Sequence, residues 1–497
     1  MKNPKKDSHY PAPLLIHQVE SHLKKLGLLS HSALSAPEEM LAGVTIDSRK
    51  VRQGDMFIAI SGFELDGHNY ISNALSLGAK LIISERPIAG ISNLLVVKSS
   101  RFAWAHIEDL RYGHPGNELK IIGFTGTNGK TSTAWMASHL LDQLGKSNLM
   151  LGTLGIKWQG RLEDSSHTTV DPDQLYKWLR LAVSEGVEYV LMEVSSHSLS
   201  QGKVDPLRFF GAVWISFSRD HLDFHQTMAR YLEAKVSLFN LVREDGFSLI
   251  HRDILKEYPE ALELLEVFKY DTYALSQAKK GFFFLDRCLY YEKDNFSLKV
   301  QSPYVGPLLN SNLVAAITSI TALLKENIST VFSQVAHLPQ VPGRFEFVGY
   351  GSGESKVFVE YAHTPDAIVK ACQSIKADFQ NCRLRLLIGC GGERDRGKRP
   401  LMAEAAAREA EVIYFTSDNP RREAPEQILN DMLSGNLGTK IPVVILDREE
   451  AIKKAIGDLV DGCILLISGK GHETYQQIGT ERIPFDDRVV ARKYLKN

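Results

Sequence analysis

The sequence predicts an α/β protein of three domains, with a central nucleotide-binding sheet and a C-terminal, doubly wound, Rossmann-like sheet. The chain has 497 residues, which suits about three domains of ordinary size. At 120–144 a buried strand runs into a glycine-rich loop and a helix, and beyond residue 343 strands alternate with helices. Both patterns are typical of mostly parallel sheets covered by helices.

The first domain is expected over residues 1–112. It combines a helix at Leu14–Leu26 with short strands at Met56–Ile60 and Lys80–Ile83, and the turn-rich stretch 62–69 separates the two strands. The segment 111–117 carries glycine and proline, which interrupt both kinds of regular structure. We therefore place the first domain boundary after residue 112.

The central domain is expected over residues 113–338. It opens with a strand at Lys120–Thr125 and a helix from Lys130 to about Leu144, which Gly145 ends. The remaining elements expected here are strands at 189–194 and 213–215, a β-rich stretch at 281–301 and a helix at 310–325.

The C-terminal domain is expected over residues 339–497. Helix-like segments separate five expected strands, at 357–360, 384–389, 412–416, 443–446 and 464–468. Ligands of such sheets bind beyond the carboxyl ends of the strands. The polar motifs of this region stand at those ends, so we expect a binding site there.

Composition argues against several function classes. The chain is 44% hydrophobic and 24% charged, with a net charge of −1, which gives no reason to expect a nucleic acid or a membrane as partner. The basic start, Met1–Lys6, is not followed by the apolar segment of a signal peptide, and no apolar run approaches the length of a membrane span. Five cysteines without CxxC spacing indicate free thiols in the protein core and a reducing compartment.

The most specific motif is the loop that follows the first central strand. Glycines let backbone N–H groups converge on phosphate oxygens, and the start of a helix favours anions. Phe124 stands where the standard P-loop spacing requires glycine, so this loop is shorter than usual. Lys130 is suited to neutralise phosphate charge, and Thr131 to ligate Mg²⁺. The expected ATP-binding residues of the loop are Gly126, Thr127, Asn128, Gly129, Lys130, Thr131 and Ser132.

Acidic and histidine residues follow in three stretches. Glu193 ends a strand, residues 218–225 contain two histidines and two aspartates, and Lys235 lies on an expected helix. Carboxylate oxygens near a phosphate loop suit Mg²⁺, a hard cation usually held together with substrate phosphates. A dinucleotide site at Gly389–Gly391 is not expected, because Arg394 occupies the place of the third glycine.

These motifs together resemble the Mur ligase family. The match rests on 125–131, 193–197 and 218–225, and it continues through Val341–Glu346, Tyr361–Asp366, Gly389–Pro400, Asp418–Arg421 and Gly469–Glu473, with Asp47–Arg49 and Gly54–Phe57 near the start. Within that family the chain is most similar to the ligases that add meso-diaminopimelate to UDP-N-acetylmuramoyl-L-alanyl-D-glutamate.

The resemblance implies a cytoplasmic, monomeric enzyme of peptidoglycan precursor synthesis that uses ATP and Mg²⁺. It also implies the reaction: the D-glutamate γ-carboxylate attacks the γ-phosphate of ATP, and the amine of the amino acid then displaces phosphate from the acyl phosphate. It also implies a set of catalytic and metal-binding residues, namely Lys130, Thr131, Glu193, His221 and Lys235. In this set Lys235 is expected to be carbamylated to N6-carboxylysine.

The resemblance further implies three sets of binding residues. For ATP these are Asn312, Arg344 and His363, in addition to the loop. For the UDP-muramoyl dipeptide they are Ser48, Thr168, Thr169, Ser195, Gln201 and Lys203. For meso-diaminopimelate they are Arg394, Asp418, Asn419, Pro420, Arg421, Gly469 and Glu473.

The chain departs from the family pattern at four positions. Lys203 replaces an arginine, Glu360 an aspartate, Leu309 an asparagine, and His251 lies in a segment that usually contains asparagine. Three other functions stay open at this point: the same ligation with L-lysine, a folylpolyglutamate synthetase-like reaction, and a nucleotide-dependent switch or motor. Arg421 argues against lysine, and the N-terminal domain argues against the folate enzyme. A switch leaves residues 390–473 unexplained.

Overall fold

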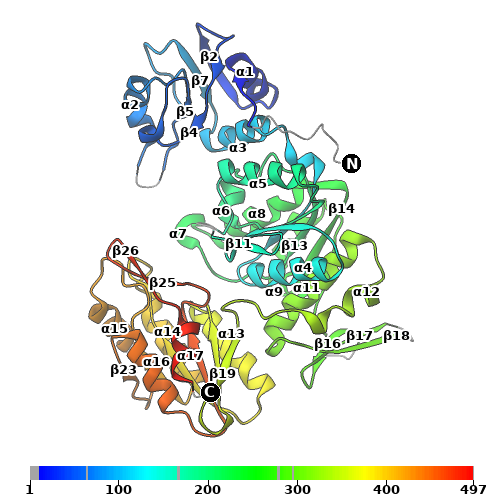
Figure 1. Cartoon of the computed structure of the whole chain (residues 1–497), viewed down its shortest axis with the longest axis vertical. Coiled ribbons are helices and arrows are strands. Elements are labelled where there is room, and N and C mark those ends of the chain that lie inside the picture. Colours follow the sequence, from blue (N-terminus) through cyan, green and yellow to red (C-terminus); the bar gives the residue numbers. More distant parts are fainter. Residues whose placement is uncertain (1–10, 63–64, 165–167, 277–279, 294–295, 496–497) are drawn as a thin grey trace. The chain divides into compact units, whose positions relative to one another are not determined.

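A computed structural model describes residues 11–62, 65–164, 168–276, 280–293 and 296–495 (Figure 1). The chain divides into two compact units: residues 1–134 with 145–273, and residues 135–144 with 274–497. The basic start, Met1–Lys6, and residues 63–64 of the turn-rich stretch lie outside the described residues.

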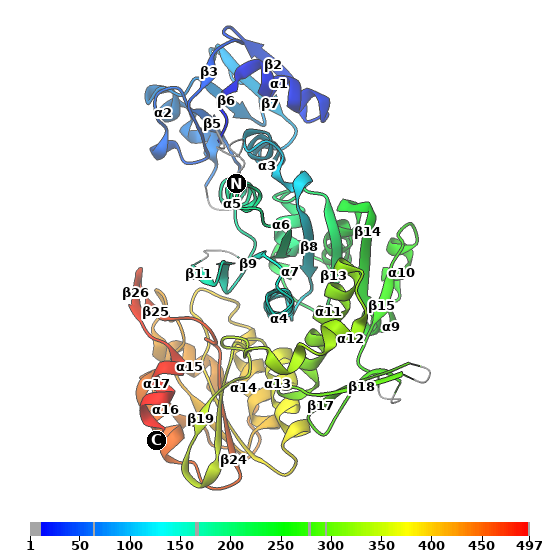
Figure 2. The ribbon, with the colours of Figure 1, turned by 45° about the vertical axis from the view of Figure 1, so that its right-hand side comes forward.

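The N-terminal domain is built on a five-stranded sheet. Its order is β2 (Leu29–Leu34), β7 (Asn93–Val97), β6 (Leu81–Ser84), β5 (Met56–Ile58) and β4 (Val44–Thr45), with only β2 antiparallel to its neighbour. Successive side chains point to opposite faces of a strand, so each face acquires its own core. One core joins the sheet to α1 (Ile16–Lys25) and α3 (Ser100–Arg111), and the other joins it to α2 (Ile71–Ser76) (Figure 2). A two-stranded pair, β1 (Leu14–Leu15) and β3 (Met40–Leu41), completes the domain.

The central sheet has eight strands. In order they are β11 (Arg161–Glu163), β10 (Gly155–Trp158), β9 (Asn148–Gly152), β12 (Tyr189–Glu193), β8 (Lys120–Thr125), β13 (Phe209–Trp214), β14 (Val242–His251) and β15 (Asp271–Tyr273). The six strands from β9 to β15 are parallel, whereas β10 and β11 are antiparallel. The expected mostly parallel sheet is confirmed.

Neighbouring strands of this sheet bring the motifs together. The strands β12, β8 and β13 lie side by side, and their carboxyl ends are Glu193, Thr125 and Trp214. Parallel strands end at the same edge of a sheet, so the three loops that follow must meet there. Beyond the N-terminal domain, this unit also contains α5 (Pro172–Ser184), α6 (Ser196–Ser200), α7 (Leu222–His225), α8 (Met228–Val236), α9 (Arg252–Glu257) and α10 (Glu260–Leu265), while α4 (Lys130–Gln143) begins in it.

The part of the second unit that begins at residue 274 opens with a three-stranded antiparallel sheet. Its strands are β16 (Gly281–Leu285), β17 (Cys288–Lys293) and β18 (Phe296–Gln301), and α11 (Gly306–Leu324) and α12 (Ile328–Phe332) follow. Helix α11 begins four residues before the sequence prediction because Pro307 lies in its first turn, where its missing N–H costs nothing.

Helix α11 also corrects the expectation that no apolar run reaches the length of a membrane span. Its 19 residues have a mean hydropathy of 1.4, which satisfies the length and composition of such a span. However, 61% of this stretch is buried in the protein, and the buried face includes Asn310 and Asn312. These properties fit the core helix of a folded domain.

The C-terminal sheet has six strands, in the order β19 (Glu346–Tyr350), β20 (Lys356–Glu360), β24 (Cys463–Ser468), β21 (Arg383–Ile388), β22 (Val412–Phe415) and β23 (Val443–Val444). All neighbours are parallel except β19 and β20. One face packs on α16 (Arg448–Gly457) and α17 (Asp487–Tyr494). The other elements are α13 (Pro365–Asp378), α14 (Lys398–Glu409), α15 (Pro425–Leu433) and the hairpin β25 (Tyr475–Ile478) and β26 (Glu481–Pro484) (Figure 1).

Candidate functional site

The loop between β8 and α4 has the backbone that a phosphate site requires. Gly129 adopts φ +88°, a conformation that a residue with a side chain rarely takes. The Lys130 ammonium folds back over the loop and donates to the carbonyl oxygens of Gly126 and Thr127 at 2.7 and 3.1 Å. A lysine held in this way closes the loop and keeps its charge beside the N-terminus of α4, where anions are favoured.

The segment after β13 fixes the same loop from the other side. Ser216 accepts from the Asn128 N–H at 2.8 Å and donates to the Asn128 carbonyl at 2.9 Å. The Thr127 hydroxyl bonds to the Tyr231 hydroxyl at 3.0 Å and accepts from the Ser218 N–H at 3.0 Å. The loop is therefore held in one conformation by hydrogen bonds from outside it.

The carboxylate of Glu193 lies at the centre of this edge of the sheet. Glu193 is almost completely buried, with 1% of its surface exposed. It accepts from the Thr131 hydroxyl at 2.9 Å and from the N–H and hydroxyl of Thr153 at 2.6 and 3.2 Å. A side chain at Gly152 would come within 2.3 Å of the carboxylate, so glycine at this position leaves room for it. The structure thus brings the predicted Thr131 and Glu193 together.

His221 and Lys235 face the loop lysine. Burial lowers the pKa of Lys235 well below its usual range, and the positive charge of Lys130 lowers it further. Burial is also the largest cause that lowers the pKa of His221 to about 4, while the charge of Asp220 opposes the shift. His221 has φ +52°, an uncommon backbone conformation for a residue with a side chain. An imidazole of this pKa is neutral at physiological pH.

The predicted metal ligands do not form a closed cage. Among the described residues, no group of three or more His, Cys, Asp or Glu side chains is arranged to hold a metal ion. Thr131 and Glu193 nevertheless provide adjacent oxygens. Mg²⁺ typically uses one or two carboxylates and completes its shell with water and substrate phosphates, so an open pair suits it better than a cage.

Three of the residues expected to bind the muramoyl dipeptide lie near Glu193, and a fourth ends the helix that follows it. The Thr169 hydroxyl donates to the Glu193 carbonyl at 2.9 Å and accepts from the Ser195 N–H at 3.1 Å. The Thr168 hydroxyl lies 3.1 Å from the Thr153 hydroxyl, and Ser195 caps α6. Gln201 follows α6 as its C-cap residue.

The other two expected contacts have different surroundings. Lys203 donates to the Asp171 carboxylate at 2.6 Å, so the lysine that replaces the family arginine already has a partner. Ser48 is buried in the N-terminal domain, and its carbonyl accepts from the Asn73 amide at 3.4 Å.

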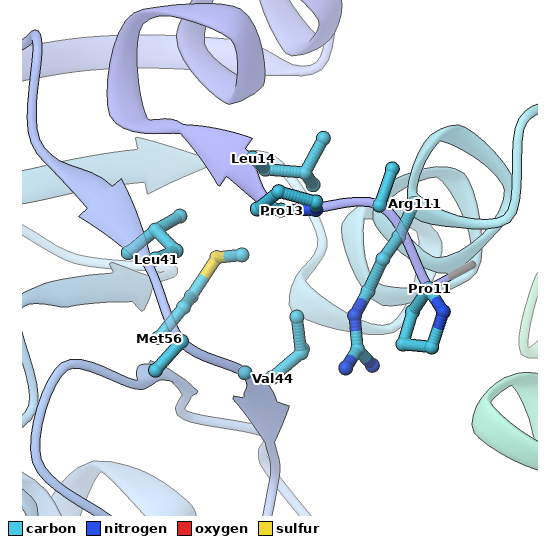
Figure 3. A pocket seen from close by; sticks show the side chains of 10 residues that line it. Pro11, Pro13, Leu14, Leu41, Val44, Met56 and Arg111 are labelled. Atoms are coloured by element: carbon cyan, nitrogen blue, oxygen red, sulfur yellow. The ribbon is translucent and has the colours of Figure 1, made fainter. Parts of the chain in front are cut away.

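A small cavity of about 100 Å³ also lies in the N-terminal domain (Figure 3). Its wall combines Pro11 and Arg111 at one end with Leu41, Val44 and Met56 at the other. Arg111 supplies a charged side chain to the wall, and none of the predicted site residues is among the lining residues. We assign it no role in the chemistry.

Two of the expected ATP contacts of the second unit lie beside Tyr361. The Arg344 guanidinium lies 4.2 Å from the centre of the Tyr361 ring, and a ring nitrogen of His363 bonds to the Tyr361 carbonyl at 2.8 Å. Asn312 is buried on α11, one turn beyond the family departure Leu309, which is also buried.

Two further departures from the family pattern have structural partners. Glu360 is buried and accepts from the Phe345 N–H at 2.8 Å, and burial raises the pKa of its carboxyl group. His251 caps α9 by accepting from the Asp253 N–H at 3.3 Å. Both side chains therefore bind backbone of the chain itself.

The loop after β22 carries the residues expected to bind the amino acid. The Asp418 carboxylate accepts from the Asn419 N–H at 2.6 Å, and the Asn419 amide donates to Glu473 at 2.8 Å. Pro420 packs so closely on Gly392 that a side chain there would meet its carbonyl oxygen at 1.9 Å. Gly469 likewise leaves room for the Asp418 carboxylate, which a side chain would meet at 2.6 Å.

Arg421 is held by the hairpin of β25 and β26, and not only by the turn before it. Its φ is +51°, its N–H donates to the Gln477 carbonyl at 3.0 Å, and its carbonyl accepts from Gly479 at 2.7 Å. The guanidinium donates to the Gly392 carbonyl at 2.6 Å, and no carboxylate among the described residues makes an ion pair with it. Arg394, the remaining predicted residue, is exposed.

Sequence reasoning missed several residues that support these loops. Ser216, Tyr231 and Thr153 are single polar residues outside any motif, and only the fold brings them to the site. Arg448 is buried and forms an ion pair with Asp487, with 2.7 Å between nitrogen and oxygen. Its guanidinium also donates to the carbonyls of Ser417 and Ser468, which directly precede the predicted amino-acid-binding residues Asp418 and Gly469. No spacing signal links these positions.

Three sequence families match the chain in order. They are described as the Mur ligase family, catalytic domain, over residues 41–116, the Mur ligase middle domain over 124–320, and the Mur ligase, glutamate ligase domain, over 343–471. The UDP-N-acetylmuramoyl-L-alanyl-D-glutamate--2,6-diaminopimelate ligase of Geobacillus thermodenitrificans is 39% identical over 471 residues, which are 92% of this chain and 95% of that protein.

Solved structures agree with this relationship. A structure of a UDP-N-acetylmuramoyl-L-alanyl-D-glutamate--2,6-diaminopimelate ligase has a TM-score of 0.65 and 30% identity, with 97% of this chain and 98% of that one covered. A folylpolyglutamate synthase of Mycobacterium tuberculosis has a TM-score of 0.61 and 17% identity, with 74% of this chain and 92% of that one covered. At this identity the similarity shows a shared fold alone. The chain belongs to the Mur ligase family.

Proposed function

We propose that the protein is an ATP-dependent ligase that adds meso-2,6-diaminopimelate to UDP-N-acetylmuramoyl-L-alanyl-D-glutamate through an acyl phosphate, in the synthesis of peptidoglycan precursors. The observation that carries this proposal is the 39% identity, over 92% of the chain, to a relative named for ligation of 2,6-diaminopimelate. The residues at the carboxyl edges of the two large sheets have the chemistry that the reaction requires.

The phosphate loop would hold ATP for attack by the substrate carboxylate. The Lys130 ammonium and the N–H groups at the start of α4 would neutralise charge on the transferred phosphoryl group. Attack by a carboxylate brings two anions together, so this compensation is needed before the reaction can proceed. Asn312, Arg344 and His363 are proposed to contact the rest of the nucleotide.

Glu193 and Thr131 fit Mg²⁺, because a buried carboxylate and a hydroxyl 2.9 Å apart form a set of hard oxygen donors. When bound, Mg²⁺ supplies charge neutralisation at the phosphates. His221, neutral because its pKa is lowered to about 4, offers an additional nitrogen donor facing the same loop.

Lys235 is proposed to be carbamylated. Its pKa is lowered well below the usual range by burial, so a fraction of the amine is uncharged and able to add to CO₂. None of the described residues forms an ion pair with its ammonium group, and it lies 4.6 Å from the Tyr231 ring centre. A carbamate would exchange the cation for an anionic oxygen ligand beside Lys130.

The two remaining substrates are assigned to separate sets of residues. Ser48 is assigned to the uridine, and the muramoyl dipeptide is assigned to Thr168, Thr169, Ser195, Gln201 and Lys203. The amino acid is assigned to Arg394, Asp418, Asn419, Pro420, Arg421, Gly469 and Glu473. Arg421 would pair with the second carboxylate of meso-diaminopimelate, because a guanidinium offers paired donors to that group.

The alternatives fit less well. Ligation of L-lysine would leave the Arg421 guanidinium without an anionic partner, and the relatives are named for diaminopimelate. A folylpolyglutamate synthase matches only 74% of this chain. We further propose a cytoplasmic, monomeric enzyme.

Product analysis tests the proposed function. The purified protein is incubated with ATP, Mg²⁺, the UDP-muramoyl dipeptide and either meso-diaminopimelate, L-lysine or no amino acid, and the products are identified by mass spectrometry. We expect the tripeptide product with meso-diaminopimelate. If the dipeptide carries ¹⁸O in its γ-carboxylate, an acyl phosphate requires one ¹⁸O in the released phosphate. Unlabelled phosphate, or no tripeptide, contradicts the proposal.

A further inference from the structure

Lys470 is a buried lysine that the reaction described above does not use. It lies in the loop after β24 and none of its surface is exposed. Its ammonium group donates to three acceptors, Asn419 Oδ1 at 3.1 Å, Glu473 Oε2 at 3.0 Å and the Tyr475 carbonyl at 2.6 Å. A lysine ammonium has three N–H donors, so all of them are used inside the protein.

These contacts determine how Asn419 presents its side-chain amide. Its oxygen accepts from Lys470 and also from the Gln477 N–H at 2.8 Å, which fills both lone pairs. Its nitrogen must therefore face Glu473, to which it donates at 2.8 Å. An amide turned the other way would place its NH₂ group against two donors.

Two polar groups of this network are left without a partner in the described part of the chain. They are one N–H of the Asn419 amide and Oε1 of Glu473, and neither has a protein partner among the described residues. The Glu473 side chain is 19% exposed, so it remains accessible. An N–H donor beside a carboxylate acceptor complements the carboxylate and ammonium of an amino-acid zwitterion.

We propose that Lys470 is a positioning residue that orients Asn419 and Glu473 toward the zwitterionic end of the incoming amino acid. The inference rests on the proposed function and adds a residue to it. Lys470 acts through its neighbours and does not itself touch the substrate, because its three donors are occupied by the chain.

The same ammonium also fixes the hairpin that holds Arg421. Tyr475, whose carbonyl accepts from Lys470, is the first residue of β25. Two residues later, Gln477 provides the carbonyl that accepts from the Arg421 N–H. The loss of Lys470 would therefore disturb both ends of the expected amino-acid site, whereas the phosphate loop belongs to the other unit of the chain.

Steady-state kinetics of Lys470→Met test this role. Removal of hydrogen bonds to charged groups predicts an apparent KM for meso-diaminopimelate that rises about 10-fold or more. The KM values for ATP and the UDP-muramoyl dipeptide should stay within about twofold of wild type. Lys453→Met is the matched control, because Lys453 is an exposed lysine of α16 that forms an ion pair with Glu450 and lies outside the predicted amino-acid site.

A double-mutant cycle separates positioning from general stabilisation. If Lys470 acts through Asn419, Lys470→Met should raise the KM for meso-diaminopimelate much less in an Asn419→Ala background than in wild type. Lys470→Gln keeps donor groups and is expected to recover part of the lost affinity. Full additivity in the cycle, or equal changes in all three KM values, overturns the proposal.

The outcome can be distinguished from failure of the proposed function. Wild-type protein that consumes ATP in response to meso-diaminopimelate establishes the reaction, and an unchanged KM in a folded Lys470→Met variant then counts against Lys470 alone. Wild-type protein without that response overturns the proposed function. If neither Lys470 variant folds, Lys470 is a stabilising residue and the positioning role is rejected.

Discussion

Glu193→Gln is the most informative change at the phosphate edge, because it removes a charge while keeping the shape of the side chain. The carboxylate accepts three hydrogen bonds, one from Thr131 and two from Thr153. A glutamine can still accept from the Thr153 N–H, and the two hydroxyl groups can reverse their direction. The amide can therefore keep contacts with Thr131 and Thr153, so we expect the variant to fold.

The expected cost to stability is small. Hydrogen bonds to charged groups contribute roughly 1 kcal/mol more than neutral ones, so three of them predict a loss of about 3 kcal/mol at most. Removing a buried charge offsets part of that loss. At about 2–4 °C per kcal/mol for domains of this size, the Tm should fall by less than about 12 °C.

The expected cost to activity is much larger. Loss of one preorganised charge-stabilising group typically lowers kcat by about 10²–10³-fold. The assay is ADP release at saturating substrates as a function of Mg²⁺ concentration, and the concentration for half-maximal rate should rise. Glu188→Gln is the matched control, since Glu188 is an exposed carboxylate paired with Lys120 just before the same strand. A folded Glu193→Gln variant with wild-type rate and Mg²⁺ dependence would refute the assignment.

Four further predictions concern single residues. Lys130→Ala should lower ligation by about 10²-fold or more through lost phosphate neutralisation, and near-normal turnover of folded protein excludes that role. Lys235→Ala should lose activity and regain part of it when short-chain carboxylates are added. An intact mass of the active wild-type protein that lacks the mass of one CO₂ contradicts carbamylation. Arg421→Ala should raise the KM for meso-diaminopimelate about 10-fold or more with little change for ATP, and an unchanged preference over lysine defeats the substrate assignment. Burial lowers the pKa of His225 to about 4. As the pH falls, the imidazole is therefore protonated in the unfolded state before it is protonated in the folded state. The free energy of unfolding should fall by up to about 1.4 kcal/mol per pH unit between about pH 6.5 and 4. His225→Asn should make the free energy of unfolding, measured by denaturant titration at several pH values, depend less on pH. The same pH dependence in the variant and in wild type would exclude His225 as its cause.

The elements with a strong pattern were predicted from the sequence. Lys120–Thr125 forms β8 as expected, because a fully buried parallel strand reads as a continuous apolar run. The helix that begins at Lys130 and the β-rich stretch 281–301 were also predicted. Local signals are sufficient where burial is complete and a glycine turn marks the boundary.

Weaker elements were missed for identifiable reasons. Strand β2 has a partly exposed, polar sequence, and its position depends on pairing with β7 far along the chain. The expected strand 443–446 is reduced to Val443–Val444. The hairpin of β25 and β26 was not predicted because its residues are mostly polar and partly exposed, yet it holds Arg421.

The residues of the candidate site could likewise be predicted only in part. Motif residues such as Lys130 and Glu193 could be named from the sequence, because their types match phosphate and metal chemistry. Their partners could not, since Ser216, Thr153 and Tyr231 become neighbours only through the strand order of the central sheet. Lys470 lies inside a motif that the sequence shows, but its complete burial and its hydrogen bonds are seen only in the structure.

The most direct test of the central claim is the rate of ADP release by purified protein with the UDP-muramoyl dipeptide, ATP and Mg²⁺. The rate is compared with meso-diaminopimelate, with L-lysine and without an amino acid. A ligase with Arg421 at its amino-acid site should release ADP rapidly only with meso-diaminopimelate, and lysine should be used less efficiently by about 10-fold or more. Steady ADP release without any amino acid, or equal rates with lysine, would contradict the account.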